Sequence, residues 1–245
     1  MTPEDQYMAD FMAVFSGVER WGPGSDDDSL RALRAVAHTP QRIVDIGCGK
    51  GFATRLLAQH TRAHITAVDN EPGALQALQQ YLDQQGLSPR VQCVNASMTE
   101  LPFGQAQFDL IWAEASAYVM GFEAALQQWQ PLLQHDGYLV ISDLVWLTQQ
   151  PSTEATTFWK QEYPDMQSVS RRLQQIQQAG YRLMDHFTLS EQAWRDYYLP
   201  LKARVAEVKA NMPDSCAIAD IEHEIGVFEQ HLGEFGYQMF VLQRS

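Results

Sequence analysis

The sequence is short of positive charge. Its 245 residues include 17 Lys and Arg against 30 Asp and Glu, which gives a formal net charge of −13 at pH 7. The longest basic run is the pair Arg171 and Arg172. Proteins that bind nucleic acid neutralise phosphates with clustered cations, so this composition disfavours DNA or RNA as a partner.

Cysteine and metal-binding motifs are scarce as well. The three cysteines, Cys48, Cys93 and Cys216, lie far apart and form no C-x-x-C pair, which indicates neither a disulfide framework nor a zinc ribbon. His223 and His231 are separated by about two helical turns, too far to bind one ion from the same helix, and the chain has no H-E-x-x-H motif. We expect no metal site.

Long hydrophobic runs are also missing. The longest apolar stretches have the size of strands, far short of the roughly 20 residues that span a bilayer. The N-terminal residues are acidic and lack the cationic start and apolar stretch of a secretory signal. We therefore expect a cytoplasmic protein without a membrane partner, and the length fits one domain with additions.

The sequence does contain a regular alternation of short β-rich runs and amphipathic stretches, which is typical of a parallel sheet covered by helices. Strands are predicted at residues 41–46, 63–68, 90–95, 107–113 and 138–142, with helices at 52–60, 72–85 and 121–134. Pro131 should kink the third of these helices or mark its last turns. Farther along, the pattern predicts a helix at 168–178, a strand at 181–189, a helix-rich stretch at 191–233 and a last strand at 237–243.

The most informative segment runs from Val44 to Phe52. A buried strand leads into Gly47, Gly49 and Gly51 at alternate positions, and then into a helix. Glycines let the backbone turn sharply and approach a ligand, and the unpaired N–H groups of the helix start face the same space. The G-x-G-x-x-G spacing of dinucleotide-binding folds fails, because Phe52 occupies the sixth position. A nicotinamide oxidoreductase is disfavoured for that reason.

Asp45 stands two residues ahead of the first glycine. An acid there would repel a pyrophosphate but can face a cationic amine, so the predicted ligand is a nucleoside that carries a positive charge. Cys48 lies inside the loop, and the sequence points to no base that would activate it. We interpret it as a small residue whose backbone faces the ligand, and not as a nucleophile.

Further segments follow the glycine motif in order. They are VDN at 68–70, NASMTELPF at 95–103, FDLI at 108–111 and LQHDGYLVIS at 133–142. With the glycine motif, they resemble the class I S-adenosylmethionine-dependent methyltransferases over nearly the whole chain. RWGPGS at 20–25, EASAY at 114–118 and WRDYY at 194–198 are similar to small bacterial members of that family whose substrate is unassigned.

The resemblance implies a Rossmann-like α/β fold with a seven-stranded, mostly parallel sheet whose last strand is antiparallel. It implies a single domain, with a helical lead-in at 1–40, a core at 41–188 and 236–245, and a helical insertion at 189–233. It also implies S-adenosyl-L-methionine as the cofactor.

The same resemblance assigns residues to the cofactor. Asp69 would accept hydrogen bonds from both ribose hydroxyls, and Met98 would pack on the adenine. Ser97 stands where the family often has an Asp that binds the adenine amino group, and a Ser can still accept one hydrogen bond. The other expected cofactor-binding residues are Asp45, Gly47, Cys48, Gly49, Asn70 and Ala113, with Trp21 and Gly24 from the lead-in.

The resemblance also implies methyl transfer to a small-molecule acceptor. Glu114 and Tyr118 follow the fourth predicted strand, at the sheet edge where open α/β folds bind ligands. We expect both in the substrate pocket and in catalysis, with Glu114 as the base for a hydroxyl or amine acceptor; the alternatives are a solvent-facing acid and a packed tyrosine. Trp194, Tyr197 and Tyr198 are expected to line the pocket, although aromatic residues at helical spacing also pack cores.

An alternative function keeps the same cofactor site. The protein would then bind S-adenosylmethionine for a non-methylating reaction or as a sensor. Turnover to S-adenosylhomocysteine separates the two hypotheses.

Overall fold

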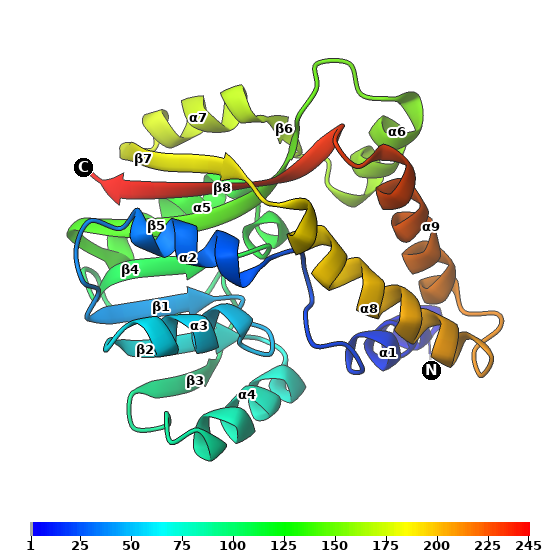
Figure 1. Ribbon diagram of the computed structural model, residues 1–245, viewed down its shortest axis with the longest axis horizontal. Helices are drawn as coiled ribbons and strands as arrows, with labels where there is room; N and C mark the ends of the chain where they lie inside the picture. The colour runs from blue at the N-terminus through cyan, green and yellow to red at the C-terminus, as the bar shows by residue number, and fades with distance from the viewer. Residues whose placement is uncertain (1) are drawn as a thin grey trace.

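One mixed sheet organises the computed structural model, which describes residues 2–245. Within that range eight strands join the sheet; seven follow the order β3-β2-β1-β4-β5-β8-β7, and the two-residue β6 pairs with β5. Strands β1 to β5 are parallel to their neighbours among themselves, whereas β8 runs antiparallel to both β5 and β7. The predicted Rossmann-like fold, with seven main strands and an antiparallel last one, is confirmed (Figure 1).

The strands lie close to their predicted positions. Their bounds are β1 Arg42–Ile46, β2 His64–Asp69, β3 Val91–Asn95, β4 Phe108–Ala113, β5 Leu133–Trp146, β6 Gln167–Ser168, β7 Tyr181–Thr188 and β8 Phe235–Arg244. Strands β6 and β5 are the exceptions. The sequence does not predict β6. Strand β5 is predicted only at 138–142. It extends to Trp146 because β8 pairs with it along its whole second half. This part of β5 is buried on both faces, so it lacks the alternation that reveals a strand in sequence.

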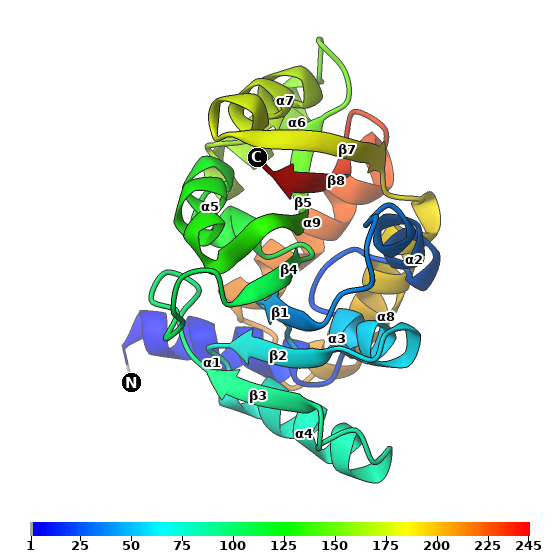
Figure 2. The ribbon, with the colours of Figure 1, turned by 90° about the vertical axis from the view of Figure 1, so that its left-hand side faces the viewer.

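Helices cover both faces of the sheet. Their bounds are α1 Pro3–Phe15, α2 Asp26–Arg34, α3 Phe52–His60, α4 Pro72–Gln84, α5 Phe122–Trp129, α6 Thr153–Glu162, α7 Val169–Gln178, α8 Glu191–Lys209 and α9 Cys216–His231. Figure 2 shows α2 and α3 on one side of the sheet and α5 and α7 on the other. The helix predicted at 121–134 ends at Trp129, because Pro131 cannot donate a backbone hydrogen bond; a short 3₁₀ turn, Gln130–Leu132, follows.

Alternate strand residues supply two hydrophobic cores. Ile43 and Leu110 pack with α2, α3 and α4, whereas their neighbours Val44 and Ile111 pack with α5 and α7. This follows from the strand geometry, in which successive side chains point to opposite faces. None of the helices in the described part of the chain is long and apolar enough to cross a membrane.

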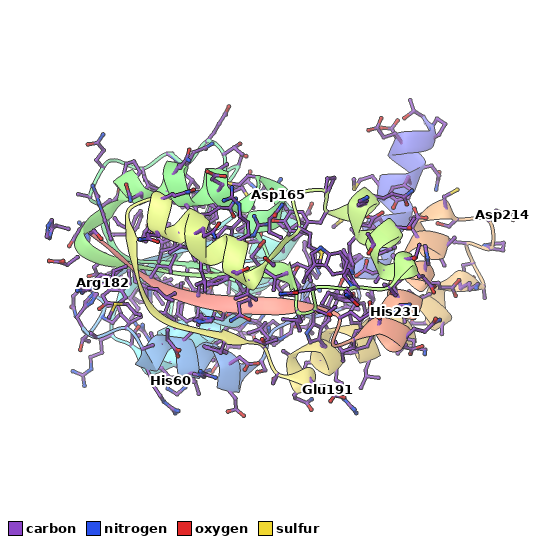
Figure 3. The ribbon with its side chains drawn as sticks, turned by 90° about the horizontal axis from the view of Figure 1, so that it is seen from above. His60, Asp165, Arg182, Glu191, Asp214 and His231 are labelled. Carbon is purple, nitrogen blue, oxygen red and sulfur yellow. The ribbon has the colours of Figure 1, made fainter. Side chains whose placement is uncertain are left out.

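Helices α1, α6, α8 and α9 form a second layer, the cap, beyond the carboxyl ends of the parallel strands (Figure 1). Helices α1, α6 and α8 each pack against α9. Seen from above, Asp214 of the cap lies at one end of the molecule and Arg182 near the other, with Glu191 and His231 between them (Figure 3). The cap thus includes the lead-in helix and the predicted insertion, together with α6, for which the sequence pattern made no prediction.

A buried ion pair between α7 and the sheet is joined by a tyrosine from the end of α6, which connects it to the cap. The Nε of Arg172 on α7 donates to Asp143 Oδ2 on β5 at 2.7 Å, and neither side chain is exposed to solvent. The hydroxyl of Tyr163, just after α6, donates to Asp143 Oδ1 at 2.9 Å and accepts from Arg172 Nη2 at 2.7 Å. Burial raises the pKa of Asp143 to about 6 despite the nearby guanidinium. The carboxylate therefore depends on Arg172 to remain charged in the interior.

Replacing the buried guanidinium should be costly. We expect Arg172→Met to lower the free energy of unfolding by about 3–5 kcal/mol, because it leaves Asp143 buried without its cation. The neighbouring, exposed Arg171 provides a matched control, and Arg171→Met should change stability by less than about 0.5 kcal/mol. Urea unfolding followed by tryptophan fluorescence measures both. Equal effects of the two substitutions would contradict a structural role for the buried pair.

Candidate active site

The glycine loop between β1 and α3 adopts a backbone that side chains resist. Gly47, Gly49 and Gly51 have φ angles of 73°, 52° and 82°, in the left-handed region that glycine enters readily. A Cβ on Gly47 would lie only 2.4 Å from the Cβ of Ser116, whereas a Cβ on Gly49 would meet no atom within 4 Å. The loop therefore packs closely on the end of β4 and faces open space at its middle glycine.

Hydrogen bonds fasten this loop to the end of β2. The amides of Gly47 and Cys48 both donate to the carbonyl of Val68, at 2.8 and 3.0 Å. The amide of Gly49 donates to Asp69 Oδ2 at 2.7 Å, and the amide of Glu71 donates to Asp69 Oδ1 at 2.9 Å. The Asp69 carboxylate is thus held in one orientation by two backbone groups.

One side of the loop forms what we call the loop pocket. Its walls are the glycine loop, residues 19–23 of the lead-in, and Glu114 and Ala115 after β4. Asp45 lies at its base, almost fully buried, where Thr54 Oγ1 donates to Asp45 Oδ2 at 2.5 Å. Asp45, at the end of β1, and Glu114, after β4, therefore meet at this pocket, and Glu19 of the lead-in is a third acid in its lining.

Burial disfavours the charged forms of Asp45 and Glu114. Burial raises the pKa of Asp45 to about 7, against the opposing effect of the Thr54 hydrogen bond. Burial also raises the pKa of Glu114, whose Oε1 accepts from Ser29 Oγ at 2.5 Å and from Trp112 Nε1 at 2.9 Å. A positively charged ligand would favour the ionised form of both carboxyl groups.

Two cations that line the loop pocket, Lys50 and Arg20, contact backbone carbonyls and an aromatic ring. Lys50 Nζ donates to the backbone carbonyls of Ser16 and Val18, at 2.8 and 2.5 Å. The guanidinium of Arg20 lies 4.4 Å from the ring centre of Phe52. In residues 2–245 neither cation forms an ion pair with Asp45 or Glu114, although the charge of Arg20 opposes the burial that raises the pKa of Glu114.

On the other side of Gly47 lies what we call the strand-edge pocket. It is lined by residues 68–70 after β2, residues 96–99 after β3, and Ala115, Ser116 and Val119. The carbonyl of Met98 accepts from Trp129 Nε1 at 3.2 Å, which fixes the backbone of that segment. Apolar groups from Val68 and Met98 face the carboxylate of Asp69 across this pocket, a combination suited to a nucleoside.

A third cavity, the aromatic chamber, lies under the cap. It offers about 280 Å³ and is enclosed by aromatic residues from α1, α6, α8 and β8. Trp194, Tyr197 and Tyr198 of α8 all contribute to its wall and are at least 94% buried, with exposed fractions of 2%, 6% and 3%. Trp194 stacks on Tyr198 with ring centres 5.9 Å apart.

The three cavities meet at one place. Ala115 lines all of them, and Trp21, Gly22 and Pro23 line both the loop pocket and the aromatic chamber. Trp21 Nε1 donates to the carbonyl of Phe15 at 2.9 Å, which fixes the indole at this boundary. A ligand in the loop pocket and another in the aromatic chamber would therefore share a wall.

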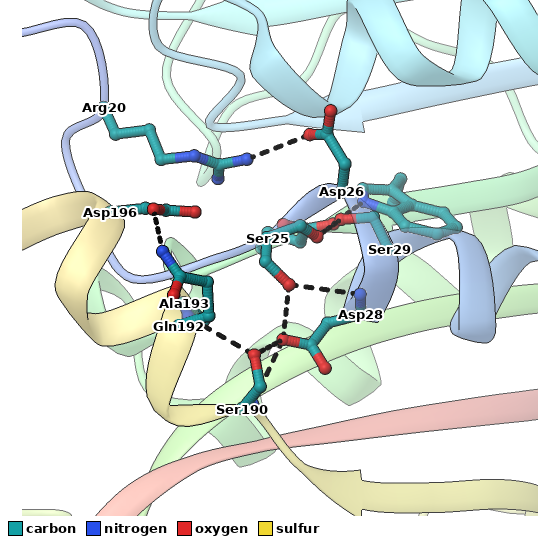
Figure 4. Close-up of polar contacts among 11 residues, drawn as sticks. Arg20, Ser25, Asp26, Asp28, Ser29, Ser190, Gln192, Ala193 and Asp196 are labelled. Atoms are coloured by element: carbon teal, nitrogen blue, oxygen red, sulfur yellow. Dashed lines mark hydrogen bonds and ion pairs between the residues drawn. The ribbon is translucent and has the colours of Figure 1, made fainter.

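The lead-in is anchored on both sides of this boundary (Figure 4). Asp28 Oδ2 accepts from Ser25 Oγ at 2.6 Å, and from the amide and the hydroxyl of Ser190 at 3.1 and 2.7 Å. The amide of Gly24 donates to the carbonyl of Ala193 at 3.2 Å. The start of α2 and the start of α8 are thereby tied together next to Glu114.

The chain is similar to known methyltransferases in sequence and in fold. Residues 43–137 match the family model described as a methyltransferase domain. The chain is 24% identical to the O-methyltransferase resE of Aspergillus sclerotiorum, over 98% of this chain and 94% of that protein. The S-adenosylmethionine-dependent methyltransferase of Geobacter sulfurreducens, solved with S-adenosyl-L-homocysteine, superposes with a TM-score of 0.81 at 14% identity, covering 96% of this chain and 97% of that chain.

The chain is an S-adenosylmethionine-dependent methyltransferase, with its methyltransferase domain at residues 43–137. The cyclase SpnF has the same fold, with a TM-score of 0.78 at 17% identity over 98% of this chain and 93% of that one. The fold of this methyltransferase is therefore shared with a protein described by another activity.

Most of the predicted cofactor residues of the methyltransferase lie together. The loop pocket gathers Trp21, Asp45, Gly47, Cys48 and Gly49, and the strand-edge pocket gathers Asp69, Asn70, Ser97 and Met98. Two predicted residues lie outside both pockets. Ala113 is fully buried in the core beneath α5, and the Cα of Gly24 faces the side chains of Arg20 and Glu114.

The two predicted catalytic residues are separated by the structure. Glu114 lines the loop pocket and not the aromatic chamber, because its carboxylate turns toward Ser29 and Trp112. Tyr118 does line the chamber, where its ring lies 5.9 Å from that of Tyr163, and it remains 42% exposed. Burial raises the pKa of the Cys48 thiol well above its ordinary value, which disfavours a nucleophilic thiolate.

Sequence reasoning missed most of the chamber wall. Phe11 and Phe15 of α1, Trp159 of α6, Tyr163 and Tyr237 all line it. They come from three separate parts of the chain, α1, the end of α6 and β8, so no single motif connects them. The one available signal was the aromatic content of the lead-in and the cap.

The buried carboxyl of Asp45 should make folding depend on pH. Its pKa of about 7 lies above the ordinary value of 3.8, so the folded state retains a proton that the unfolded state releases, and stability falls as pH rises from about 4 to about 7. Asp45→Asn keeps an acceptor for Thr54 and removes this loss. Relative to the parent, it should gain about 2–3 kcal/mol more at pH 8 than at pH 5.

Urea unfolding at the two pH values measures this difference. Asp27→Asn, an exposed acid on α2, is the control and should show no such dependence. A constant effect of Asp45→Asn at both pH values would contradict the raised pKa.

Proposed function

We propose that this methyltransferase binds S-adenosylmethionine across its glycine loop and transfers the methyl group to a small molecule held in the aromatic chamber. The observation that carries this proposal is the shared wall. Trp21, Gly22, Pro23 and Ala115 border both the loop pocket and the aromatic chamber. A donor on one side can therefore meet an acceptor on the other.

The unpaired thiols of Cys48, Cys93 and Cys216 suit a reducing compartment, and we place the protein in the cytoplasm.

The side chains fit the three chemical parts of the cofactor. In the loop pocket, Asp45 and Glu114 suit the positively charged methionine end. Asp69, which keeps free lone pairs beside its two backbone hydrogen bonds, suits a pair of ribose hydroxyls. Ser97 and Met98 in the strand-edge pocket suit the adenine. The open space beside Gly49 leaves room for a backbone contact.

The protein residues act by positioning and by excluding water. When bound, S-adenosylmethionine supplies a methyl group on a sulfonium that accepts attack from a nucleophile. Trp21 and Pro23 stand between the loop pocket and the aromatic chamber, so the cofactor and the acceptor would meet beside them. The cap encloses the acceptor. Holding two reactants in line and away from solvent supplies most of what this reaction needs from a protein.

Glu114 has a binding role in this proposal. Its Oε1 accepts hydrogen bonds from Ser29 and Trp112, and it lies outside the aromatic chamber, so it is badly placed to take a proton from an acceptor there. We assign it to the charged end of the cofactor. Tyr118, which reaches the chamber, is the better candidate to orient the acceptor.

The relatives do not agree on one reaction. The O-methyltransferase resE matches along its sequence, and a cyclase shares the fold. Fold alone does not fix the chemistry of a site. The experiment that tests methyl transfer is incubation of the purified protein with radiolabelled S-adenosylmethionine and a pool of small acceptors, followed by detection of S-adenosylhomocysteine. Binding of the donor without any turnover would favour the non-methylating alternative.

Removing the carboxylate of Asp69 should weaken cofactor binding. We expect Asp69→Ala to reduce the affinity for S-adenosylmethionine by about a hundredfold, because it loses charge-assisted hydrogen bonds to the ribose and the anchor of the Gly49 amide. Isothermal titration calorimetry measures the change, and a thermal melt confirms that the variant is folded.

Asp83→Ala provides the matched control for Asp69. Asp83 is an exposed acid on α4 that bonds only Ser88 and Gln79, so its removal should leave the affinity unchanged. An affinity for Asp69→Ala equal to that of the parent would overturn the assignment of the ribose to this residue.

A further inference from the structure

The charged residues that line the aromatic chamber are of one sign. Within the described residues, the chamber wall includes Glu162 and Glu224 and no Lys, Arg or His. Glu162 lies at its exposed rim, whereas Glu224 is half-buried on α9. An acceptor in this chamber therefore meets negative charge and aromatic rings.

Glu224 differs from the other two glutamates of its helix. Glu222 forms an ion pair with Lys209 at 2.7 Å, and Glu229 forms one with Lys202. Glu224 instead points toward α8, where the hydroxyl of Tyr198 donates to its Oε1 at 2.6 Å, and it has no ion-pair partner in residues 2–245. Burial raises the pKa of Glu224, because a carboxylate without a cation is costly to desolvate.

The aromatic walls complement this carboxylate. Burial first, and then the charge of Glu224, raises the pKa of Tyr197 and Tyr198, so both remain neutral phenols. Trp194 stacks against Tyr198 at 5.9 Å, and Tyr197 meets Tyr198 edge-on at 4.6 Å between ring centres. Neutral aromatic faces around a cavity attract cations through the ring quadrupole, and they favour substituted ammonium groups in particular.

We propose that the methyl acceptor is an amine, an inference that rests on the proposed function. It enters the aromatic chamber as an ammonium ion, with Glu224 as its counter-ion and the rings of α8 as its cover. The same surroundings repel carboxylate and phenolate acceptors, because the negative charges of Glu162 and Glu224 line the chamber. The cation that Glu224 lacks in the protein is thus supplied by the substrate.

The transfer step balances with this acceptor. The ammonium gives its proton to Glu224, and the nitrogen lone pair forms the new carbon–nitrogen bond. The carbon–sulfur bond breaks and its electron pair stays on sulfur, which leaves S-adenosylhomocysteine. The methylated amine carries the positive charge and remains complementary to the chamber until it leaves.

Binding of a matched pair of probes tests the charge preference without turnover. Choline and 3,3-dimethylbutan-1-ol have nearly the same shape, and only choline carries a charge. In the presence of S-adenosylhomocysteine, we expect choline to bind about tenfold more tightly or better, as measured by quenching of tryptophan fluorescence. Equal affinities of the two probes would overturn the inference.

Two variants on one helix locate the effect. Glu224→Gln keeps an acceptor for Tyr198 and removes the charge, so it should reduce the preference for choline to less than about threefold, because only the aromatic contribution remains. Glu222→Gln is the matched control and should keep the full preference. An unchanged preference in Glu224→Gln would overturn the role of Glu224.

A panel of acceptors separates this inference from the proposed function. We expect N-methylbenzylamine to yield S-adenosylhomocysteine, and p-cresol and phenylacetate to yield at least tenfold less. Turnover of p-cresol or phenylacetate with the amine inactive would overturn the amine assignment and support methyl transfer. Failure to bind S-adenosylmethionine in the calorimeter would instead overturn the proposed function itself.

Discussion

The hydrogen bond between the Gly49 amide and the Asp69 carboxylate joins the glycine loop after β1 to the end of β2, and the two pockets proposed for the cofactor adjoin it. It holds the glycine loop against β2, so that the loop pocket lies on one side of Gly47 and the strand-edge pocket on the other. Asp69 is fixed by backbone groups and not by mobile side chains. The binding surface is therefore largely set before any ligand arrives, which lowers the entropy lost on binding.

Charge is distributed differently on the two faces of the cap. Two exposed glutamates of α9, Glu222 and Glu229, are paired with lysines, whereas Glu224 faces the interior and, within residues 2–245, has a phenol as its partner. The loop pocket shows the same pattern, because Asp45 is buried next to a hydroxyl. Uncompensated carboxylates inside a fold reduce its stability, and they gather here at the cavities where cationic ligands are proposed to bind.

Much of the sheet could be predicted from the sequence, because its signals are local. The short β-rich runs of β1 to β4 and the spacing of Gly47, Gly49 and Gly51 depend only on neighbouring residues. The second half of β5 could not be predicted, since β8 pairs with it from about ninety residues farther along the chain and buries both of its faces. Helix α6 lay in a stretch without a clear period.

The cofactor pockets were easier to predict than the aromatic chamber, again because their sequence signals are local. Asp45 and Asp69 each lie in a local motif, whereas Glu224 and Tyr163 reach the chamber only through the packing of α9 and α6. Glu114 shows how finely orientation matters. It follows β4 as expected, but hydrogen bonds from Ser29 and Trp112 turn its carboxylate toward the loop pocket.

The attachment of the cap limits how the chamber can open. Only residues 189–190 separate β7 from α8, and only residues 232–234 separate α9 from β8. Strands β7 and β8 are hydrogen-bonded neighbours, so both ends of the α8–α9 pair hinge at one edge of the sheet. Such a pair can tilt about that edge as a rigid body but cannot swing away from it. Both ends of the helix pair that borders the chamber are therefore tethered to the same two strands.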